Sequence, residues 1–308
     1  MSWLELTIRA HRREWRYLEG ALAQVGSLSV TLQDAADEPI LEPGPGEMPL
    51  WKELLVTALF DAGTDRRGLR AVLQDLVYTL DDERFAFREV ADADWTRAWM
   101  DQYRPMRFGD RLWVCPSGMD LPTDARAPGA AEPVVVSLDP GLAFGSGTHP
   151  TTALCLEWLD GLATRGLLAG APVLDYGCGS GILAIAAVKL GAVRAVGVDS
   201  DPQALLAARD NARRNGIDDA AFAVLDPAAF AARPEAGEGF DVVVANILAG
   251  TLVALEPVLA RATRPGGRIA LSGVLADQAS EVLVAYGADF DGLQTTRRED
   301  WVRIASDA

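Results

Sequence analysis

Hydrophobic residues in the first third of the chain recur with two different periods. Four segments carry apolar side chains at about every second position, which predicts strands at Leu4–Ile8, Leu28–Leu32, Glu53–Phe60 and Phe85–Val90. Two segments repeat at helical spacing, Trp15–Val25 and Leu69–Leu80. The order strand, helix, strand, strand, helix, strand is that of a ferredoxin-like α+β domain. No residue here has an evident chemical role, so we interpret residues 1–91 as a binding or positioning domain, with a mere scaffold as the alternative.

Residues 92–130 are expected to form a connector of helix and loop. Asp92 can cap a short helix that carries Trp95 and Trp99 one turn apart. Two Trp side chains at this spacing more often pack on a neighbouring domain than bind a cofactor. The stretch Cys115–Pro133 is rich in Pro and Gly and predicts a loop.

In residues 131–308 strands and helices alternate. Short apolar runs predict strands near Val173, Val196, Ala223, Val242 and Ile269, with helices between them. This alternation is typical of a doubly wound, mostly parallel sheet, which binds ligands at the carboxyl ends of its strands. The expected fold class is therefore α/β, a Rossmann-like sheet preceded by a smaller ferredoxin-like α+β domain.

Composition and charge narrow the range of partners. The chain has 308 residues, comfortable for two domains, and 49% of them are hydrophobic. Its net charge of −16 repels phosphate backbones, so we expect a small molecule or a Lys-rich protein as substrate and no direct binding of nucleic acid. We find no apolar leader and no uninterrupted apolar stretch, and expect neither a signal peptide nor a membrane span. Three cysteines without metal-ligand spacing suit a reducing cytoplasm and indicate no metal site.

The most informative segment is Val173–Gly181, where an apolar strand ends in an acid and three glycines follow: Gly177, Gly179 and Gly181. An apolar helix then begins at Ile182, and glycine lets the loop between them turn sharply against a ligand. A dinucleotide fingerprint would place its third glycine at position 182. The observed D-x-G-x-G-x-G spacing is instead similar to the nucleotide loop of S-adenosylmethionine (SAM) dependent methyltransferases. Many Gly-rich turns bind nothing, so the loop alone is weak support.

Two further polar side chains end predicted strands. Asp199 follows the loop by roughly 20 residues, where an acid can accept the ribose hydroxyls of a nucleotide, although it can also cap the helix that begins at Pro202. Asn246 ends the stretch Asp241–Asn246, in which residues 242–245 are all apolar. Its amide oxygen can accept a hydrogen bond from a substrate amine and so aim the nitrogen lone pair at a methyl carbon. A turn residue or helix N-cap is the alternative for Asn246.

The segment Leu138–Thr152 combines three glycines with threonines that open a helix. Hydroxyls at a helix start can cap it or bind a ligand carboxylate. His149 lies in this segment, but methyl transfer to an amine does not demand a strong base, so we assign it no catalytic role. Cys178, inside the glycine loop, needs only to be small, and we expect no covalent role for it.

Taken together, three segments closely resemble the bacterial ribosomal protein L-eleven methyltransferase family: Asp139–Thr152, Asp175–Gly181 and Asn246–Ala249. The likeness spans nearly the whole chain and includes Pro105–Gly109. It implies a cytoplasmic enzyme that uses SAM to methylate lysine side chains and the N-terminal α-amine of this large-subunit ribosomal protein. It also implies substrate recognition by residues 1–91 and SAM binding by residues 131–308, and we expect a monomer.

The resemblance also assigns site residues. By match to the family's motifs, SAM contacts carry over to Thr152, Gly177, Asp199 and Asn246, while Gly179 and Gly181 complete the cofactor loop. Asn246 is the expected catalytic residue. Phe144 can line the pocket of a growing ammonium group through cation–π contact.

Two other functions remain open at this point. One is a SAM methyltransferase acting on RNA or on a small amine, against which the net charge of −16 and the substantial first domain argue. The other is a non-catalytic SAM-binding or ribosome-assembly factor, against which the intact glycine loop and Asn246 argue.

Overall fold

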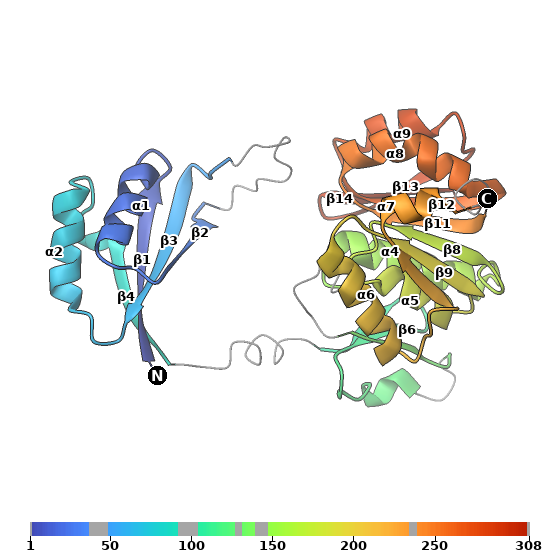
Figure 1. Ribbon diagram of the computed structural model, residues 1–308, viewed down its shortest axis with the longest axis horizontal. Coiled ribbons are helices and arrows are strands. Elements are labelled where there is room, and N and C mark those ends of the chain that lie inside the picture. The colour runs from blue at the N-terminus through green and yellow to red at the C-terminus, as the bar shows by residue number, and fades with distance from the viewer. Residues whose placement is uncertain are drawn as a thin grey trace. The chain divides into compact units, whose positions relative to one another are not determined.

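The computed structural model describes residues 2–36, 49–91, 104–126, 131–138, 147–233 and 239–306. The chain divides into two compact units, Met1–Ala98 and Trp99–Ala308, each with its own hydrophobic core (Figure 1). In the described ranges, no helix is both long and apolar enough to cross a bilayer. The predictions made for Asp92, Trp95 and Trp99 fall outside these ranges.

The first unit is a four-stranded antiparallel sheet with two helices on one face. Its elements are β1 (Ser2–His11), α1 (Trp15–Gln24), β2 (Ser29–Asp34), β3 (Glu53–Asp61), α2 (Arg66–Leu76), a 3-10 turn (Asp82–Arg84) and β4 (Phe85–Ala91). Alternate residues of β1, such as Leu4 and Leu6, are buried with Leu18 and Leu22 of α1, because a period of two directs one face of a strand into the core. The strand order β2-β3-β1-β4 confirms the ferredoxin-like prediction.

The second unit is built on a seven-stranded sheet in the order β10-β9-β8-β11-β12-β14-β13. Its elements from residue 150 on are α4 (Pro150–Thr164), β8 (Pro172–Tyr176), α5 (Ile182–Lys189), β9 (Arg194–Val198), α6 (Pro202–Arg214), β10 (Phe222–Leu225), α7 (Pro227–Ala231), β11 (Phe240–Asn246), α8 (Ala249–Ala262), β12 (Thr263–Leu275), α9 (Ala279–Tyr286), β13 (Leu293–Arg298) and β14 (Trp301–Ser306). The strands from β8 to β12 run parallel, which confirms the predicted Rossmann-like sheet. Strand β14 runs antiparallel to both of its neighbours, β12 and β13.

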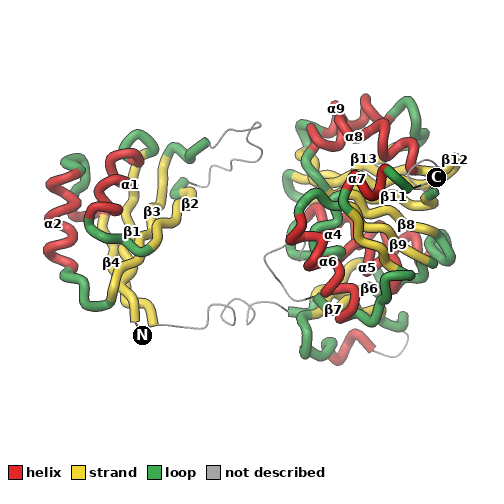
Figure 2. Tube along the Cα trace, viewed as in Figure 1, coloured by secondary structure: helices red, strands yellow, loops and turns green. Residues whose placement is uncertain are grey.

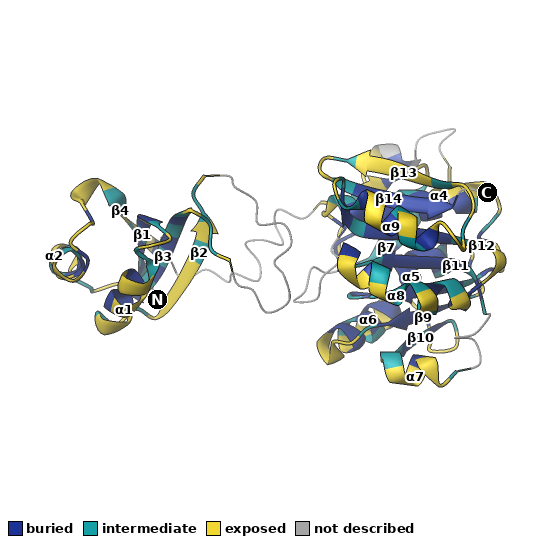
Figure 3. Ribbon diagram, turned by 90° about the horizontal axis from the view of Figure 1, so that it is seen from above, coloured by how far each residue is buried: buried dark blue, intermediate teal, exposed yellow. Residues whose placement is uncertain are grey.

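Helices cover both faces of this sheet (Figure 2). Successive residues of β11 belong to different cores: Val242 and Val244 pack with α4 and α5, and Val243 packs with α8 and α9. The central strand is therefore buried on both sides (Figure 3), which explains its continuous apolar sequence.

Two strands of a small third sheet lie where the sequence predicted only a connector of helix and loop. Strands β5 (Met106–Phe108) and β6 (Leu112–Cys115) form a hairpin, and β7 (Val134–Ser137) pairs with β6 in parallel. All four residues of β6 are buried, so the segment lacks the alternation by which a half-buried strand is recognised. The Pro- and Gly-rich stretch between β6 and β7 holds a short 3-10 turn (Thr123–Arg126).

Asp160 of α4 holds this hairpin in place. Its side chain is 1% exposed and accepts a hydrogen bond of 2.6 Å from the backbone N–H of Asp110. The guanidinium of Arg111 lies 3.8 Å from the other carboxylate oxygen. The turn residue Gly109 has a φ of 66°, and a Cβ there would collide with the Asp160 carboxylate. The hairpin is thus held against α4.

Candidate functional site

Three glycines in left-handed conformation shape the loop between β8 and α5. Gly177, Gly179 and Gly181 have φ values of 79°, 52° and 78°, where any other residue would be strained. The backbone N–H of Gly177 donates to the carbonyl oxygen of Val198 over 2.7 Å, which closes the loop against the end of β9. The Asn211 amide donates to the carbonyl oxygen of Ser180 over 2.9 Å and supports the loop from α6.

Asp175 stabilises the start of α5 from the strand before it. Gly181, the N-cap of α5, has no side chain to satisfy the first free N–H groups of the helix. The Oδ2 atom of Asp175 accepts the hydrogen bond of Ala184 N–H over 3.1 Å instead. The side chain is fully buried, and Oδ1 has no hydrogen-bond partner within the described ranges. Burial raises the pKa of Asp175 to about 7; the bond from Ala184 opposes this rise and the charge of Asp199 adds to it.

Asp199, at the end of β9, joins the glycine loop to the start of α6. One carboxylate oxygen accepts from Gly179 N–H over 2.8 Å, and the other accepts from Asp201 N–H over 3.0 Å. Asp201, rather than Asp199, caps α6, because its side chain accepts from Gln203 N–H. A carboxylate offers about four lone-pair positions, so Asp199 can accept two further hydrogen bonds.

Asn246 and Thr152 meet at the next strand end. Nδ2 of Asn246 donates to Oγ1 of Thr152 over 3.2 Å, which links β11 to the first turn of α4. The amide oxygen of Asn246 accepts no hydrogen bond from the described residues. Thr152 itself is 2% exposed, so its hydroxyl is available to the amide rather than to bulk water.

Ile247 brings the two halves of the site together. A Cβ on Gly177 would collide with Cγ2 of Ile247, so the glycine loop lies directly against the residue that follows Asn246. The strand register agrees, because Asp175 pairs with Val244 on one side and with Gly197 on the other. The carboxyl ends of β8, β9 and β11 therefore form one edge, as the sequence predicted for a ligand site.

The β5–β6 hairpin also lies next to the glycine loop, and the sequence did not predict this contact. A Cβ on Gly147, whose φ is 88°, would lie 3.3 Å from Met106 and 3.6 Å from both Phe108 and Ile182. The β5–β6 hairpin therefore approaches the start of α5 at the end of the glycine loop. The segment Pro105–Gly109 matched the family resemblance, but nothing in its pattern indicated which part of the sheet it contacts.

The other residues considered from the sequence either have contacts typical of a structural role or lie outside the described residues. Nδ1 of His149 accepts from Thr151 N–H at the start of α4, and its ring packs edge-on to Trp301 at 4.8 Å. Burial lowers the pKa of His149, opposed by the charge of Glu299. Burial strongly raises the pKa of the Cys178 thiol, which leaves it protonated and unreactive. Phe144 lies outside the described residues.

These groups fit SAM. The loop lets a ligand approach the backbone, Asp199 keeps lone pairs for two hydroxyls, and the Asn246 oxygen is an unused acceptor. No group of three His, Cys, Asp or Glu arranged to hold a metal ion occurs within the ranges described. The fold and the site together define a Rossmann-like, SAM-dependent methyltransferase.

Comparison with known proteins gives the family. The family model described as "Ribosomal protein L11 methyltransferase (PrmA)" matches residues 2–308, and this chain belongs to that family. A relative named ribosomal protein L11 methyltransferase from Xanthomonas axonopodis pv. citri is 53% identical over 309 residues, 99% of this chain and 98% of that protein. Another of the same name from Pseudomonas aeruginosa (strain LESB58) is also 53% identical, with the same coverage.

A solved structure agrees with these relatives. The ribosomal protein L11 methylase from Lactobacillus delbrueckii subsp. bulgaricus is 32% identical, with a TM-score of 0.55. The alignment covers 66% of this chain and 97% of that one.

Proposed function

We propose that this protein transfers methyl groups from SAM to amino groups of ribosomal protein L11, namely lysine side chains and the N-terminal α-amine. Two things support this: the family's printed name and, above all, the convergence of the glycine loop, Asp199 and Asn246 at one sheet edge. The proposed roles follow from position. Gly177, Gly179 and Gly181 hold the nucleotide part of SAM, Asp199 accepts the ribose hydroxyls, and Thr152 and Asn246 lie where the methionine end and the amine meet.

SAM supplies a methyl group already activated on a sulfonium, so the chain's main task is to position the nucleophile. Asn246 performs this task in the proposal, because its free amide oxygen can accept an N–H of the amine and orient the nitrogen lone pair. A lysine has a reference pKa of about 10.4 and needs help to lose its proton, whereas an α-amine at about 8 needs little. Burial beside a positive sulfonium favours the neutral amine.

The proposed division of labour follows the two units. Residues 1–91 recognise the substrate protein and residues 131–308 bind SAM. Residues 92–130 connect them, and the β5–β6 hairpin within this segment packs on α4 of the second unit. In support, every glycine-loop and strand-end residue of the site lies after residue 147, while the first unit has a core of its own. We further propose that the protein is a cytoplasmic monomer. We also propose that it makes no direct contact with nucleic acid, because its net charge of −16 repels phosphate groups.

Mass spectrometry of purified L11 after incubation with this protein and SAM tests the proposal. The expected result is a series of whole methyl additions on lysines and on the N-terminal amine. A matched incubation with an Asn246→Ala variant controls for contaminating activity. If L11 stays unmodified after prolonged incubation with folded protein that binds SAM, L11 is not the substrate.

A further inference from the structure

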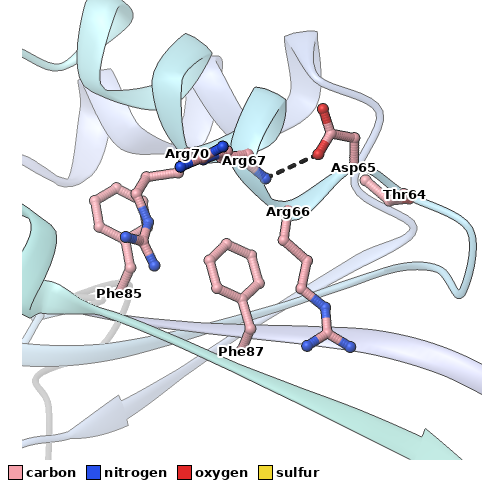
Figure 4. A pocket seen from close by; sticks show the side chains of 7 residues that line it. All are labelled: Thr64, Asp65, Arg66, Arg67, Arg70, Phe85 and Phe87. Carbon is pink, nitrogen blue, oxygen red and sulfur yellow. Dashed lines mark hydrogen bonds between the residues drawn. The ribbon is translucent and has the colours of Figure 1, made fainter.

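The first unit carries a basic, aromatic groove that the proposed chemistry does not use. It lies between the start of α2 and strand β4 and has a volume of about 690 Å³. Six residues that line it enter the argument: Asp65, Arg66, Arg67, Arg70, Phe85 and Phe87 (Figure 4). We call it the arginine groove.

Three arginines lie close together at the start of α2, where the electrostatic surroundings disfavour positive charge: Arg66, Arg67 and Arg70. A helix N-terminus carries partial positive charge and favours acids, yet the first turn of α2 has none beyond its N-cap Asp65. Arg66 and Arg70 stand one turn apart on the same side of the helix, where like charges repel. Glu89 and Asp82 offset these charges only through exposed, weak ion pairs, so an anion bound in the groove would relieve both conflicts further. The whole chain has a net charge of −16, so this cluster of arginines is not part of a generally basic surface.

Two aromatic rings fix the guanidinium of Arg70 at the edge of the groove. Its guanidinium carbon lies 5.7 Å from the ring centroid of Phe85 and 5.6 Å from that of Phe87, so two cation–π contacts fix it. Its Nε is buried and donates no hydrogen bond within the part of the chain that the structure describes. Its Nη1 lies 3.5 Å from Oδ1 of Asp82, whose side chain is 73% exposed, so this ion pair is weak and can exchange for another carboxylate. The ring of Phe87 lies between the side chains of Arg66 and Arg70 in Figure 4, which gives the groove an apolar floor between two charges.

The other two arginines are available as well. Arg66 pairs with Glu89, but both side chains are largely exposed, at 47% and 69%, and such ion pairs are weak and exchangeable. Arg67 forms no ion pair with any residue the structure describes. An incoming carboxylate can therefore replace Glu89 or bind Arg67 without breaking a strong contact.

The shape beside the groove suits an extended chain. Strand β4 is the last strand of its sheet, so the backbone groups on its outer edge have no strand partner among the described residues. Exposed edges of this kind accept an added strand through main-chain hydrogen bonds, and neighbouring pockets then select side chains.

We propose that the arginine groove docks an extended acidic segment of the methylated protein, which lies along the edge of β4 with Asp or Glu side chains against Arg66, Arg67 and Arg70. This inference rests on the proposed function, because it takes the protein substrate as the ligand. A protein segment fits better than a nucleic acid, since a short run of carboxylates matches three arginines, whereas a longer phosphate backbone would meet the acidic remainder of the chain.

Steady-state kinetics with purified L11 and saturating SAM test the docking site. We expect the double variant Arg66→Glu with Arg67→Glu to raise KM for L11 about tenfold while kcat and SAM affinity stay unchanged, because charge reversal repels the segment without touching the catalytic edge. Arg16→Glu, an exposed arginine in the first turn of α1, makes the same kind of charge change outside the groove and should leave KM within about twofold of wild type. Arg67→Lys, which keeps the charge, should do likewise.

The outcomes separate the two proposals. If the wild type methylates L11 and the double variant has the KM of the Arg16→Glu control, the groove is not the docking site and the proposed function stands. If the wild type does not methylate L11, both fail. A short RNA that competes with L11 for the wild type but not for the double variant overturns the acidic segment in favour of a nucleic acid. Unchanged SAM affinity and thermal midpoint of the variants exclude misfolding as the cause of a raised KM.

Discussion

Asn246 donates a hydrogen bond to Thr152 across 94 residues of sequence, with 3.2 Å between Nδ2 and Oγ1. The contact decides which way the amide faces. With the nitrogen turned to Thr152, the oxygen is left for a ligand, so Thr152 acts in our proposal as the positioning residue of Asn246.

Loss of either partner should affect turnover, to different degrees. Thr152→Val removes the acceptor but keeps the shape, and we expect about fivefold lower kcat, which corresponds to about 1 kcal/mol for one neutral hydrogen bond. Asn246→Ala removes the orienting oxygen itself and should lower kcat about a hundredfold. Single-turnover methylation of L11 at saturating SAM measures both. Near-normal transfer by Asn246→Ala would return this residue to a turn role.

Asp199→Ala should weaken SAM binding by about a hundredfold or more, because two hydrogen bonds to a charged acceptor, each about 1.5–3 kcal/mol, are lost. Asp199→Asn keeps the size and one acceptor oxygen and should lie between this variant and the wild type. Titration calorimetry with SAM measures the affinities, and circular dichroism checks the fold. Equal affinity in all three proteins contradicts the ribose assignment.

Gly177→Ala should cost both stability and SAM affinity. The substitution strains a backbone with a φ of 79° and forces a methyl group into Ile247. Gly170→Ala is the matched control, since its φ is 75° but a Cβ there meets nothing within 4 Å. We expect the control to lose only the backbone strain of about 1–2 kcal/mol and to bind SAM normally. Thermal unfolding and SAM titration compare the two; equal behaviour would mean that the Ile247 contact is unimportant.

The stability of the protein should depend on pH through Asp175. Because burial raises the pKa of Asp175 to about 7, the folded state keeps a proton that the unfolded state has already released near pH 4. The free energy of unfolding therefore falls as the pH rises between these values and levels off above about 7. Asp175→Asn does not titrate, so relative to wild type it should gain roughly 2–3 kcal/mol between about pH 5 and pH 8.

Denaturant unfolding of both proteins across this range measures the gain. All other titrating groups are common to the two proteins and cancel in the difference. A stability difference that is independent of pH would show that Asp175 keeps an ordinary pKa.

A variant that begins at residue 99 should keep SAM affinity and lose most methylation of intact L11. The site lies entirely in the second unit, and our proposal gives recognition to the first. A short amine-bearing peptide at high concentration should still be methylated, which controls for damage to the catalytic edge. Methylation of full L11 at the normal rate would show that the first unit is not needed for recognition.

Local patterns were enough to predict much of the fold. The strands of the first unit alternate because one face is buried, and the glycines of the cofactor loop stand where the backbone needs a positive φ. Asp199 and Asn246 could be placed because strands in a parallel sheet end at the same edge. Each of these features depends on residues that are close together in the sequence.

Long-range contacts could not be read in this way. Strand β13 is mostly exposed and polar, so it carries no hydrophobic signal, and β6 is buried throughout, so it carries no alternation. The bond between Thr152 and Asn246 joins two segments whose spacing follows only from the sheet order. Asp160, whose carboxylate fixes the β5–β6 hairpin, looks in sequence like any acid on a helix surface.

The position of β14 determines when parts of the second unit can fold during synthesis. Among the described residues, β13 pairs with β14 alone, and β14 is made after β13 and inserts beside β12. Neither strand can therefore join the sheet until Trp301–Ser306 has been synthesised. Arg303 of this late strand also donates to the carbonyl oxygen of Leu154 in α4, and Trp301 packs on His149. The helix that carries Thr152 thus receives this support only after Trp301–Ser306 has been synthesised. A nascent chain should therefore form its glycine loop before it acquires a working reaction centre, which requires Trp301–Ser306.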